Sequence, residues 1–313
     1  MILKKMAAPL LALSCAALVL GQTAEKPSEH AQTLRVDVDL VLITATVTDS
    51  DGRYVTGLRP EHFQIFEDKI EQEISYFSTE DVPLSVGIVF DTSSSMLNKL
   101  AEARAAAATF LSMGDAGDEY FLVEFNTTAQ LTHDVTRDVA SIQSRLLFIP
   151  ATGMTALYDA VYLGMDRVAH ANNSRKALLL ITDGLDNKSR YSLSEVKEFA
   201  KERDVQVYAI GIEERTNAPY AAPPPNGRAA LADLAKTTGG RAFFPDSIRD
   251  LEEICAKIAA NLKNQYVLGY RSSNLAKDGK WRKIQIKVKR PEGMPRMAVR
   301  ARTGYYAPML AKR

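Results

Sequence analysis

Apolar runs alternate with helical patterns through the middle of the chain. Five segments are predicted to be strands: LSVGIVF (84–90), EYFLVEF (119–125), AQLTHDV (129–135), KALLLIT (176–182) and VQVYAIGI (205–212). Helical spacing of apolar residues marks the segments 97–113, 156–170, 192–203, 228–238 and 247–264. Short buried strands separated by helices are typical of a mostly parallel sheet with helices on both faces. We therefore predict an α/β, doubly wound domain over residues 83–264.

Residues 34–80 and 265–308 follow a different pattern, that of short strands separated by turns. The first segment is rich in Val, Leu, Ile and Thr, breaks at the turn-forming DSDG, and resumes in FQIFED and EISYFS. The second segment contains QYVLGYR, WRKIQIKVKR and MAVRART. Because the two ends of a domain often lie close together, we predict that the segments pair into one small β module. The α/β domain would then be inserted in this module or flanked by it.

The first 24 residues have the layout of a secretory signal peptide. Lys4 and Lys5 precede an apolar run from Met6 to Leu20, and polar residues follow. We expect cleavage between Gly21 and Ala24, and hence a periplasmic or extracellular protein. An uncleaved anchor and a lipoprotein anchor at Cys15 are the alternative interpretations, although ALSC is a poor lipobox.

The composition of the chain excludes few classes of function. The formal net charge of +1 argues against a dedicated polyanion binder, and we expect no nucleic-acid partner. After cleavage the chain would keep only Cys255, which lies at helical spacing with apolar neighbours and is predicted to be a buried, unreactive thiol. The strand KIQIKVK places its charges on one face, which predicts a solvated face. Membrane contact is expected only through this basic face or an uncleaved signal.

Three polar clusters lie at the ends of predicted elements, where ligands bind in open α/β sheets. Asp91, Ser93 and Ser95 come directly after the first apolar strand. Thr155 lies in the glycine-bearing ATGMTALYDA that opens a helix, and Asp183 follows the most apolar strand. Taken singly, each has an ordinary explanation as a helix cap or a turn residue.

Together, two carboxylates and three hydroxyls form an all-oxygen ligand set suited to a hard divalent cation. Mg²⁺ is the first expectation, because it keeps several waters and needs few protein oxygens, whereas Ca²⁺ recruits more carboxylates and carbonyls. Mn²⁺ and Ca²⁺ remain the alternatives. Two aspartates only balance a divalent charge, so the ion would still attract one further anionic ligand.

The stretches DTSSSM, TGMTAL and ITDGLDN, in this order, resemble the metal-ion-dependent adhesion site of the von Willebrand factor type A (VWA) domain family. The flanks, with VTGLRPEHFQIFED before the domain and NQYVLGY and GYYAP after it, resemble a related subgroup of exported bacterial proteins. The resemblance implies a Rossmann-like sheet. It also implies an ion held by Asp91, Ser93, Ser95, Thr155 and Asp183 and completed by an acidic side chain of a protein partner.

The sequence thus predicts an exported, non-enzymatic interaction module that depends on a divalent cation. A metal-assisted hydrolase and a structural envelope protein without a functional metal are the alternatives. No G-x-S-x-G elbow or P-loop is present, and none of the four histidines adjoins a strand-end motif. Asp186 is either a second-shell residue or a solvated loop aspartate, and residues 214–228, rich in Pro and Ala, are predicted to form a long loop.

Overall fold

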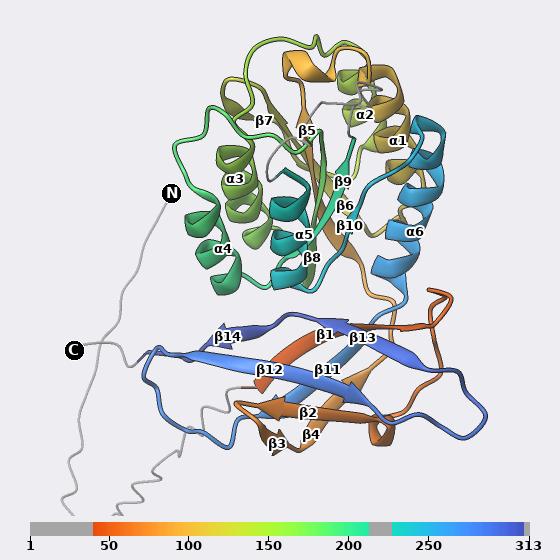
Figure 1. Ribbon diagram of the computed structural model, residues 1–313, viewed down its shortest axis with the longest axis vertical. Helices are drawn as coiled ribbons and strands as arrows, with labels where there is room; N and C mark the ends of the chain where they lie inside the picture. The colour runs from red at the N-terminus through yellow and green to blue at the C-terminus, as the bar shows by residue number, and fades with distance from the viewer. Residues whose placement is uncertain (1–39, 213–226, 310–313) are drawn as a thin grey trace, which may run out of the picture. The chain divides into compact units, whose positions relative to one another are not determined.

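The computed structural model describes residues 40–212 and 227–309, and its central feature is a six-stranded sheet (Figure 1). The strand order is β10-β9-β8-β5-β6-β7, and only the β6–β7 pair is antiparallel. The strands are β5 (Leu84–Asp91), β6 (Glu119–Phe125), β7 (Ala129–Thr136), β8 (Arg175–Thr182), β9 (Gln206–Gly211) and β10 (Ala242–Phe243). The predicted Rossmann-like, mostly parallel sheet is confirmed.

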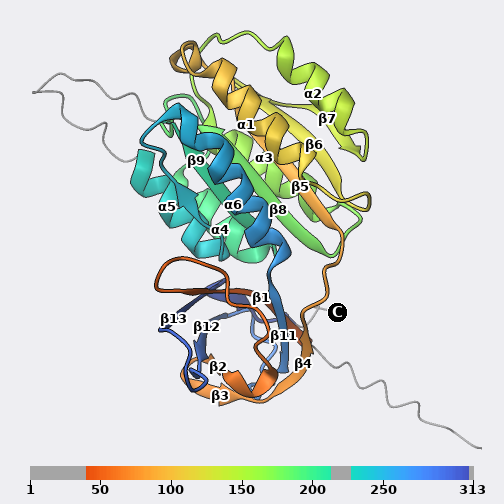
Figure 2. The same cartoon turned by 90° about the vertical axis from the view of Figure 1, so that its right-hand side faces the viewer.

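Helices cover both faces of this sheet (Figure 2). Their bounds are α1 (Leu100–Ser112), α2 (Val139–Leu147), α3 (Leu157–Ala169), α4 (Leu193–Glu202), α5 (Gly227–Thr238) and α6 (Leu251–Lys263). Side chains of α1, α2 and α6 share one core cluster with Val86, Ile88 and Phe90 of β5, whereas α3, α4 and α5 share the other with Val89. All eight residues of β5 are therefore buried, which is why its sequence is apolar apart from Ser85 and the terminal Asp91.

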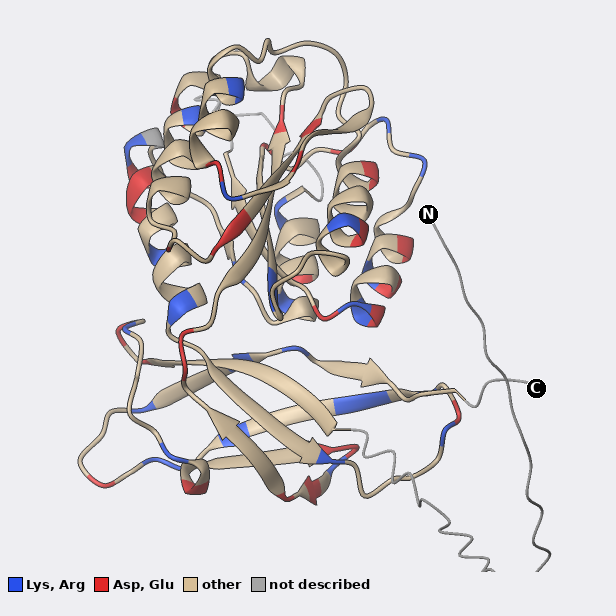
Figure 3. Ribbon diagram, turned by 180° about the vertical axis from the view of Figure 1, so that it is seen from behind, with Lys and Arg blue, Asp and Glu red and all other residues tan. Residues whose placement is uncertain are grey.

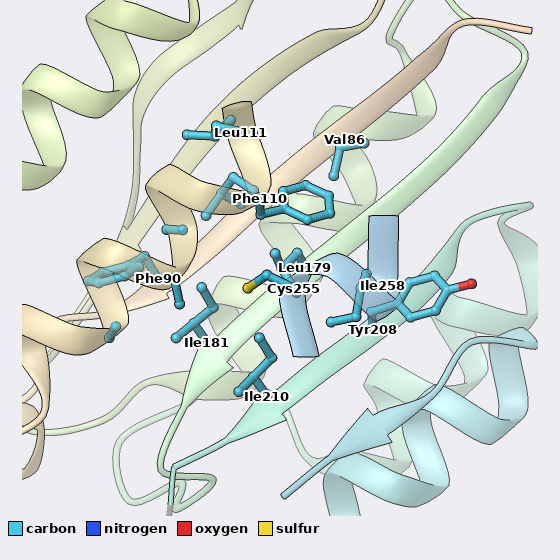
Figure 4. Packing of buried hydrophobic residues seen from close by; sticks show 14 of the residues in the cluster. Val86, Phe90, Phe110, Leu111, Leu179, Ile181, Tyr208, Ile210, Cys255 and Ile258 are labelled. Atoms are coloured by element: carbon cyan, nitrogen blue, oxygen red, sulfur yellow. The ribbon is translucent and has the colours of Figure 1, made fainter. Parts of the chain in front are cut away.

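Cys255 of α6 lies inside the first of these clusters, beside the sheet residues Leu179 and Ile181 (Figure 4). Burial raises the pKa of its thiol to about 12, and the charge of Glu252 adds to the shift. The thiol is thus fully protonated at physiological pH, and the structure agrees with the prediction of a packed, unreactive cysteine.

Two four-stranded sheets make up the β module. One has the order β13-β1-β11-β4 and the other β14-β12-β2-β3. The strands are β1 (Leu40–Asp49), β2 (Phe63–Glu67), β3 (Ile70–Gln72), β4 (Ile74–Ser78), β11 (Tyr266–Arg271), β12 (Trp281–Val288), β13 (Met297–Ala301) and β14 (Gly304–Tyr306). Strands from before the α/β domain pair with strands from after it, namely β1 with β11 and β13, and β2 with β12. Their inward residues form a third core cluster.

Strand β12 shows why alternation in sequence places charge on one face. Ile284 and Ile286 are buried, whereas Lys283, Gln285 and Lys287, at the alternate positions, are exposed. Lys and Arg also appear on other strands of the β module (Figure 3). Because β12 pairs with β14 on one side and β2 on the other, its lysines do not protect a free sheet edge.

The described part of the chain contains no helix long and apolar enough to cross a membrane. The predicted signal peptide, residues 1–24, and nearly all of the predicted loop 214–228 lie outside the described residues.

Candidate metal centre

The candidate site lies at the carboxyl ends of two neighbouring parallel strands. Asp91 is the last residue of β5. Asp183 directly follows β8, the strand that is hydrogen-bonded to β5. Strand β5 has β6 on its other side, so the chain moves outward in opposite directions from this point. Such a reversal leaves a crevice outside the strand ends, which is where open α/β sheets bind ligands.

Within the first loop, the backbone folds the donors toward one another. Asp91 Oδ1 accepts a hydrogen bond from the Ser93 amide (2.8 Å), and the hydroxyls of Ser93 and Ser95 lie 3.0 Å apart. A short 3-10 turn, η2 (Ser94–Met96), follows and directs the chain into α1. The three donors that the D-x-S-x-S spacing predicts are thus brought together by local structure.

The second loop is joined to the first through its main chain. The Ser94 amide donates to the Gly153 carbonyl (3.1 Å), and the Thr152 amide donates to the Thr92 carbonyl (2.8 Å). Gly153 has a positive φ of 82°, and a Cβ atom there would lie 2.5 Å from Thr127 Oγ1, so only glycine fits. These bonds hold the loop that carries Thr155 beside the loop that carries Ser93 and Ser95.

The third loop is anchored to Thr155 and to Asp91. Asn187 Oδ1 accepts from the Thr155 amide (2.9 Å), and the Asn187 and Lys188 amides donate to the Thr155 carbonyl (3.0 and 3.1 Å). Thr182, the last residue of β8, donates its hydroxyl to Asp91 Oδ2 (2.6 Å). All three predicted loops therefore meet at one edge of the sheet.

Residues 86–185 match the family model of the von Willebrand factor type A domain. This chain contains a VWA domain. A von Willebrand factor type A protein from Catenulispora acidiphila is 13% identical with a TM-score of 0.51, over 80% of this chain and 74% of that one, which shows a shared fold.

Two further solved structures are similar to the VWA domain. BatB, a conserved hypothetical protein from Bacteroides thetaiotaomicron, is 22% identical with a TM-score of 0.46, over 57% of this chain and 99% of that one. The vWF domain of the type V pili tip protein Mfa5 from Porphyromonas gingivalis is 14% identical with a TM-score of 0.47, over 58% and 95%. No curated protein matches the chain.

Electrostatics in the VWA domain centre on two carboxylates that are removed from water. Asp91 is 0% exposed, and burial raises its pKa to about 6. Hydrogen bonds from Ser93 and Thr182 oppose this shift, and the negative charge of Asp183 reinforces it. The side chain of Asp183 is only 6% exposed, and its Oδ1 is buried without a hydrogen-bond partner.

The donor chemistry fits a hard divalent cation. Carboxylates and hydroxyls from three loops supply only oxygen, and the unpartnered Asp183 Oδ1 is a buried acceptor whose charge a cation would neutralise. Among the described residues, no three or more His, Cys, Asp or Glu side chains are grouped to hold a metal. A site with two carboxylates and three hydroxyls would not form such a group, so the fit rests on the oxygen donors.

Three side chains near the donors were not singled out in the sequence. Thr182 orients Asp91, Asn187 orients the Thr155 loop, and the buried Lys99 places its ammonium 3.5 Å from Asp183 Oδ2. Thr182 could have been found, because it is the last residue of an apolar strand before Asp183. A lysine eight residues after Asp91 carries no such signal.

Asp186, for which the sequence left two interpretations, has a local structural role. Its Oδ1 accepts from the Ser189 hydroxyl (2.5 Å) and from the Tyr158 amide (3.4 Å) at the start of α3. The Ser189 hydroxyl in turn accepts from the amides of Tyr158 and Asp159. Asp186 therefore fastens the third loop to the first turn of α3.

Proposed function

We propose that the VWA domain binds a divalent cation, with Mg²⁺ as the first expectation, and uses it to capture a carboxylate of a protein partner. Asp91, Ser93, Ser95, Thr155 and Asp183 would hold the ion. The observation that carries the proposal is the pair of aspartates with buried side chains at neighbouring strand ends, one of which has an unpartnered buried oxygen. When bound, the ion supplies a positive charge that attracts an anionic ligand. The protein residues would hold the ion in position and shield it from bulk water.

An apolar rim favours a protein ligand over a small one. Leu97, Met154 and Leu185, which we call the apolar rim, are 66%, 54% and 37% exposed. Each belongs to a different donor loop and lies within two residues of a proposed ligand. Exposed apolar side chains gathered around a polar centre are typical of protein interaction sites. The partner segment would therefore present an acidic side chain flanked by apolar ones.

Hydrolysis is a weaker candidate because no histidine adjoins the donors as a general base among the described residues. His62 lies in η1 (Pro60–His62) of the β module, where its Nδ1 accepts from the Arg59 amide. His133 lies within strand β7, and His170 follows α3, where its Nδ1 contacts the Asp166 carbonyl. None of the three is on a donor loop, so the arrangement suits binding rather than turnover.

Export is part of the same proposal. It is supported by the charged and apolar pattern of residues 1–24. The working compartment would be the periplasm or the cell exterior, and the partner an envelope or extracellular protein.

Affinity capture from an envelope extract, in Mg²⁺ and in chelator, tests the function directly. The bait is the full chain, beside Asp91→Asn and the matched control Asp51→Asn, which removes one charge from an exposed ion pair with Arg53. We expect specific partners in Mg²⁺ for the wild type and the control, and none in chelator or for Asp91→Asn. Capture that is equal in chelator and Mg²⁺ would refute the proposal. Metal-dependent turnover of a chromogenic ester or phosphate would favour the hydrolase instead.

The apolar rim has its own test. Leu97→Ser and Met154→Ser should weaken capture by about tenfold or more, because exposed apolar anchors supply much of the binding energy at interfaces. Their Mg²⁺ affinity, measured by calorimetry, should stay within about threefold of the wild type, since neither side chain is a donor. If capture is unaffected, the rim is not part of the interface.

A further inference from the structure

Lys99 is a buried lysine whose ammonium points into the candidate metal centre. The residue is 6% exposed, although lysine is almost never buried unless it is paired. Its Nζ lies 3.5 Å from Asp183 Oδ2. Its backbone is fixed at the start of α1, where its amide donates to the Met96 carbonyl (2.8 Å) and its carbonyl accepts from the Ala103 amide (2.9 Å).

The pairing of Lys99 is with a proposed metal ligand. Asp183 offers one oxygen to the ammonium and leaves the other without a partner. Asp91 receives only the neutral donors Ser93 and Thr182. One positive charge therefore lies beside two negative ones, an imbalance that a divalent cation would reverse if Lys99 stayed in place.

We propose that Lys99 is a resident counter-ion that competes with the divalent cation for Asp183. This inference rests on the proposed function. In the metal-free protein the ammonium keeps Asp183 in position and offsets its repulsion with Asp91. When a divalent ion binds, Lys99 leaves Asp183, since a like charge at that distance would repel the ion. Lys99 thus raises the ion concentration at which the site loads, and so sets when the domain can capture a partner.

Isothermal titration calorimetry with Mg²⁺ on the full chain tests the competition. Lys99→Met keeps the length of the side chain and removes the charge, so its Mg²⁺ affinity should rise on the order of tenfold. Lys99→Arg keeps the charge and should stay within about threefold of the wild type. In chelator, Lys99→Met should melt below the wild type, because Asp183 is left buried without a counter-charge. Saturating Mg²⁺ should abolish or reverse that difference.

A measurement on the wild type needs no substitution. Acetylation by acetic anhydride, followed by mass spectrometry, reports how accessible each lysine is in chelator and in Mg²⁺. Lys99 should be labelled several times faster in Mg²⁺, whereas Lys263, paired with Asp115 at 2.9 Å away from the donor loops, should not change. This experiment also covers the case in which Lys99→Met fails to fold.

The outcomes separate the two proposals. If the wild type binds Mg²⁺ but Lys99→Met binds it no more tightly, or if Lys99 labelling is unchanged by Mg²⁺, the counter-ion role is refuted and the proposed function stands. If the wild type shows no Mg²⁺ binding, the proposed function fails and the competition fails with it. Tighter binding by Lys99→Met, together with faster labelling of Lys99 in Mg²⁺, supports both.

Discussion

Replacing Asp91 by asparagine should make the metal-free protein more stable while abolishing its response to metal. Asp91 is fully buried, and no cation is among the groups that shift its pKa. Asparagine has nearly the same shape and carries no charge. Its side-chain oxygen can still accept from the Ser93 amide, and the Thr182 hydroxyl can rotate to accept from its amide group, so the two hydrogen bonds are kept.

The size of the effect follows from the raised pKa. Burial, the largest cause, lifts the pKa of Asp91 from 3.8 to about 6. A shift of roughly two units corresponds to about 3 kcal/mol of native-state destabilisation by the ionised carboxylate. The native state keeps Asp91 protonated to higher pH than the unfolded state does. The native state therefore has its full stability below pH 3.8, and loses about 3 kcal/mol of it as the pH rises through about 6.

The assay is thermal unfolding at neutral pH in chelator. Asp91→Asn should raise the melting temperature by about 6 to 12 °C, given about 3 kcal/mol and about 2 to 4 °C per kcal/mol for a domain of this size. Asp91→Ala should lower it, because truncation leaves a cavity and removes the acceptor for the Thr182 hydroxyl. Mg²⁺ should stabilise the wild type and neither variant.

Two results would refute this reasoning. One is an Asp91→Asn protein that melts below the wild type in chelator at neutral pH, since the buried charge would then not be destabilising. The other is an equal loss of stability between mildly acidic and neutral pH in the wild type and in Asp91→Asn, since Asp91 would then not be the group that titrates.

Three further predictions concern residues outside the site. Burial raises the pKa of Glu119, but hydrogen bonds from Asn172, Ser85 and Asn173 outweigh this effect, and the pKa lies below 4.5. The ionised carboxylate therefore stabilises the fold at neutral pH. Glu119→Gln should lower the free energy of unfolding in urea by about 2 kcal/mol at neutral pH, and by clearly less below the pKa of Glu119. Asn261→Ala removes the acceptor for the hydroxyls of Thr46 and Tyr208, and should lower the free energy of unfolding by about 2 to 4 kcal/mol in the same assay. The control, Asn264→Ala, loses a hydrogen bond only to its own helix and should cost about 1 kcal/mol. Cys255 should resist iodoacetamide in the native state and react on unfolding, and native-state labelling within minutes would contradict its burial.

Much of the α/β domain could be read from the sequence because its strands are buried on both faces. A strand covered by helices on either side needs a run of apolar residues, such as ALLLI in KALLLIT, and that pattern can be recognised without tertiary information. Helix α2, by contrast, was not predicted. It buries only Ile142 and Leu146, one turn apart, and so leaves too narrow an apolar stripe to be recognised.

The order and spacing of the three donor motifs resemble the VWA pattern, and two of these motifs directly follow apolar strands that the sequence marks clearly. Sequence could not decide which strands are neighbours, since 83 residues separate the end of β5 from the start of β8. Their pairing is set by long-range packing, and it places Asp183 beside Asp91. Nor could it show that Lys99 is buried, because a lysine before a helix is ordinarily solvated and its partner Asp183 lies far away in the sequence. The sequence by itself determined which oxygen donors the chain carries, whereas the tertiary structure decided how they are charged, buried and paired.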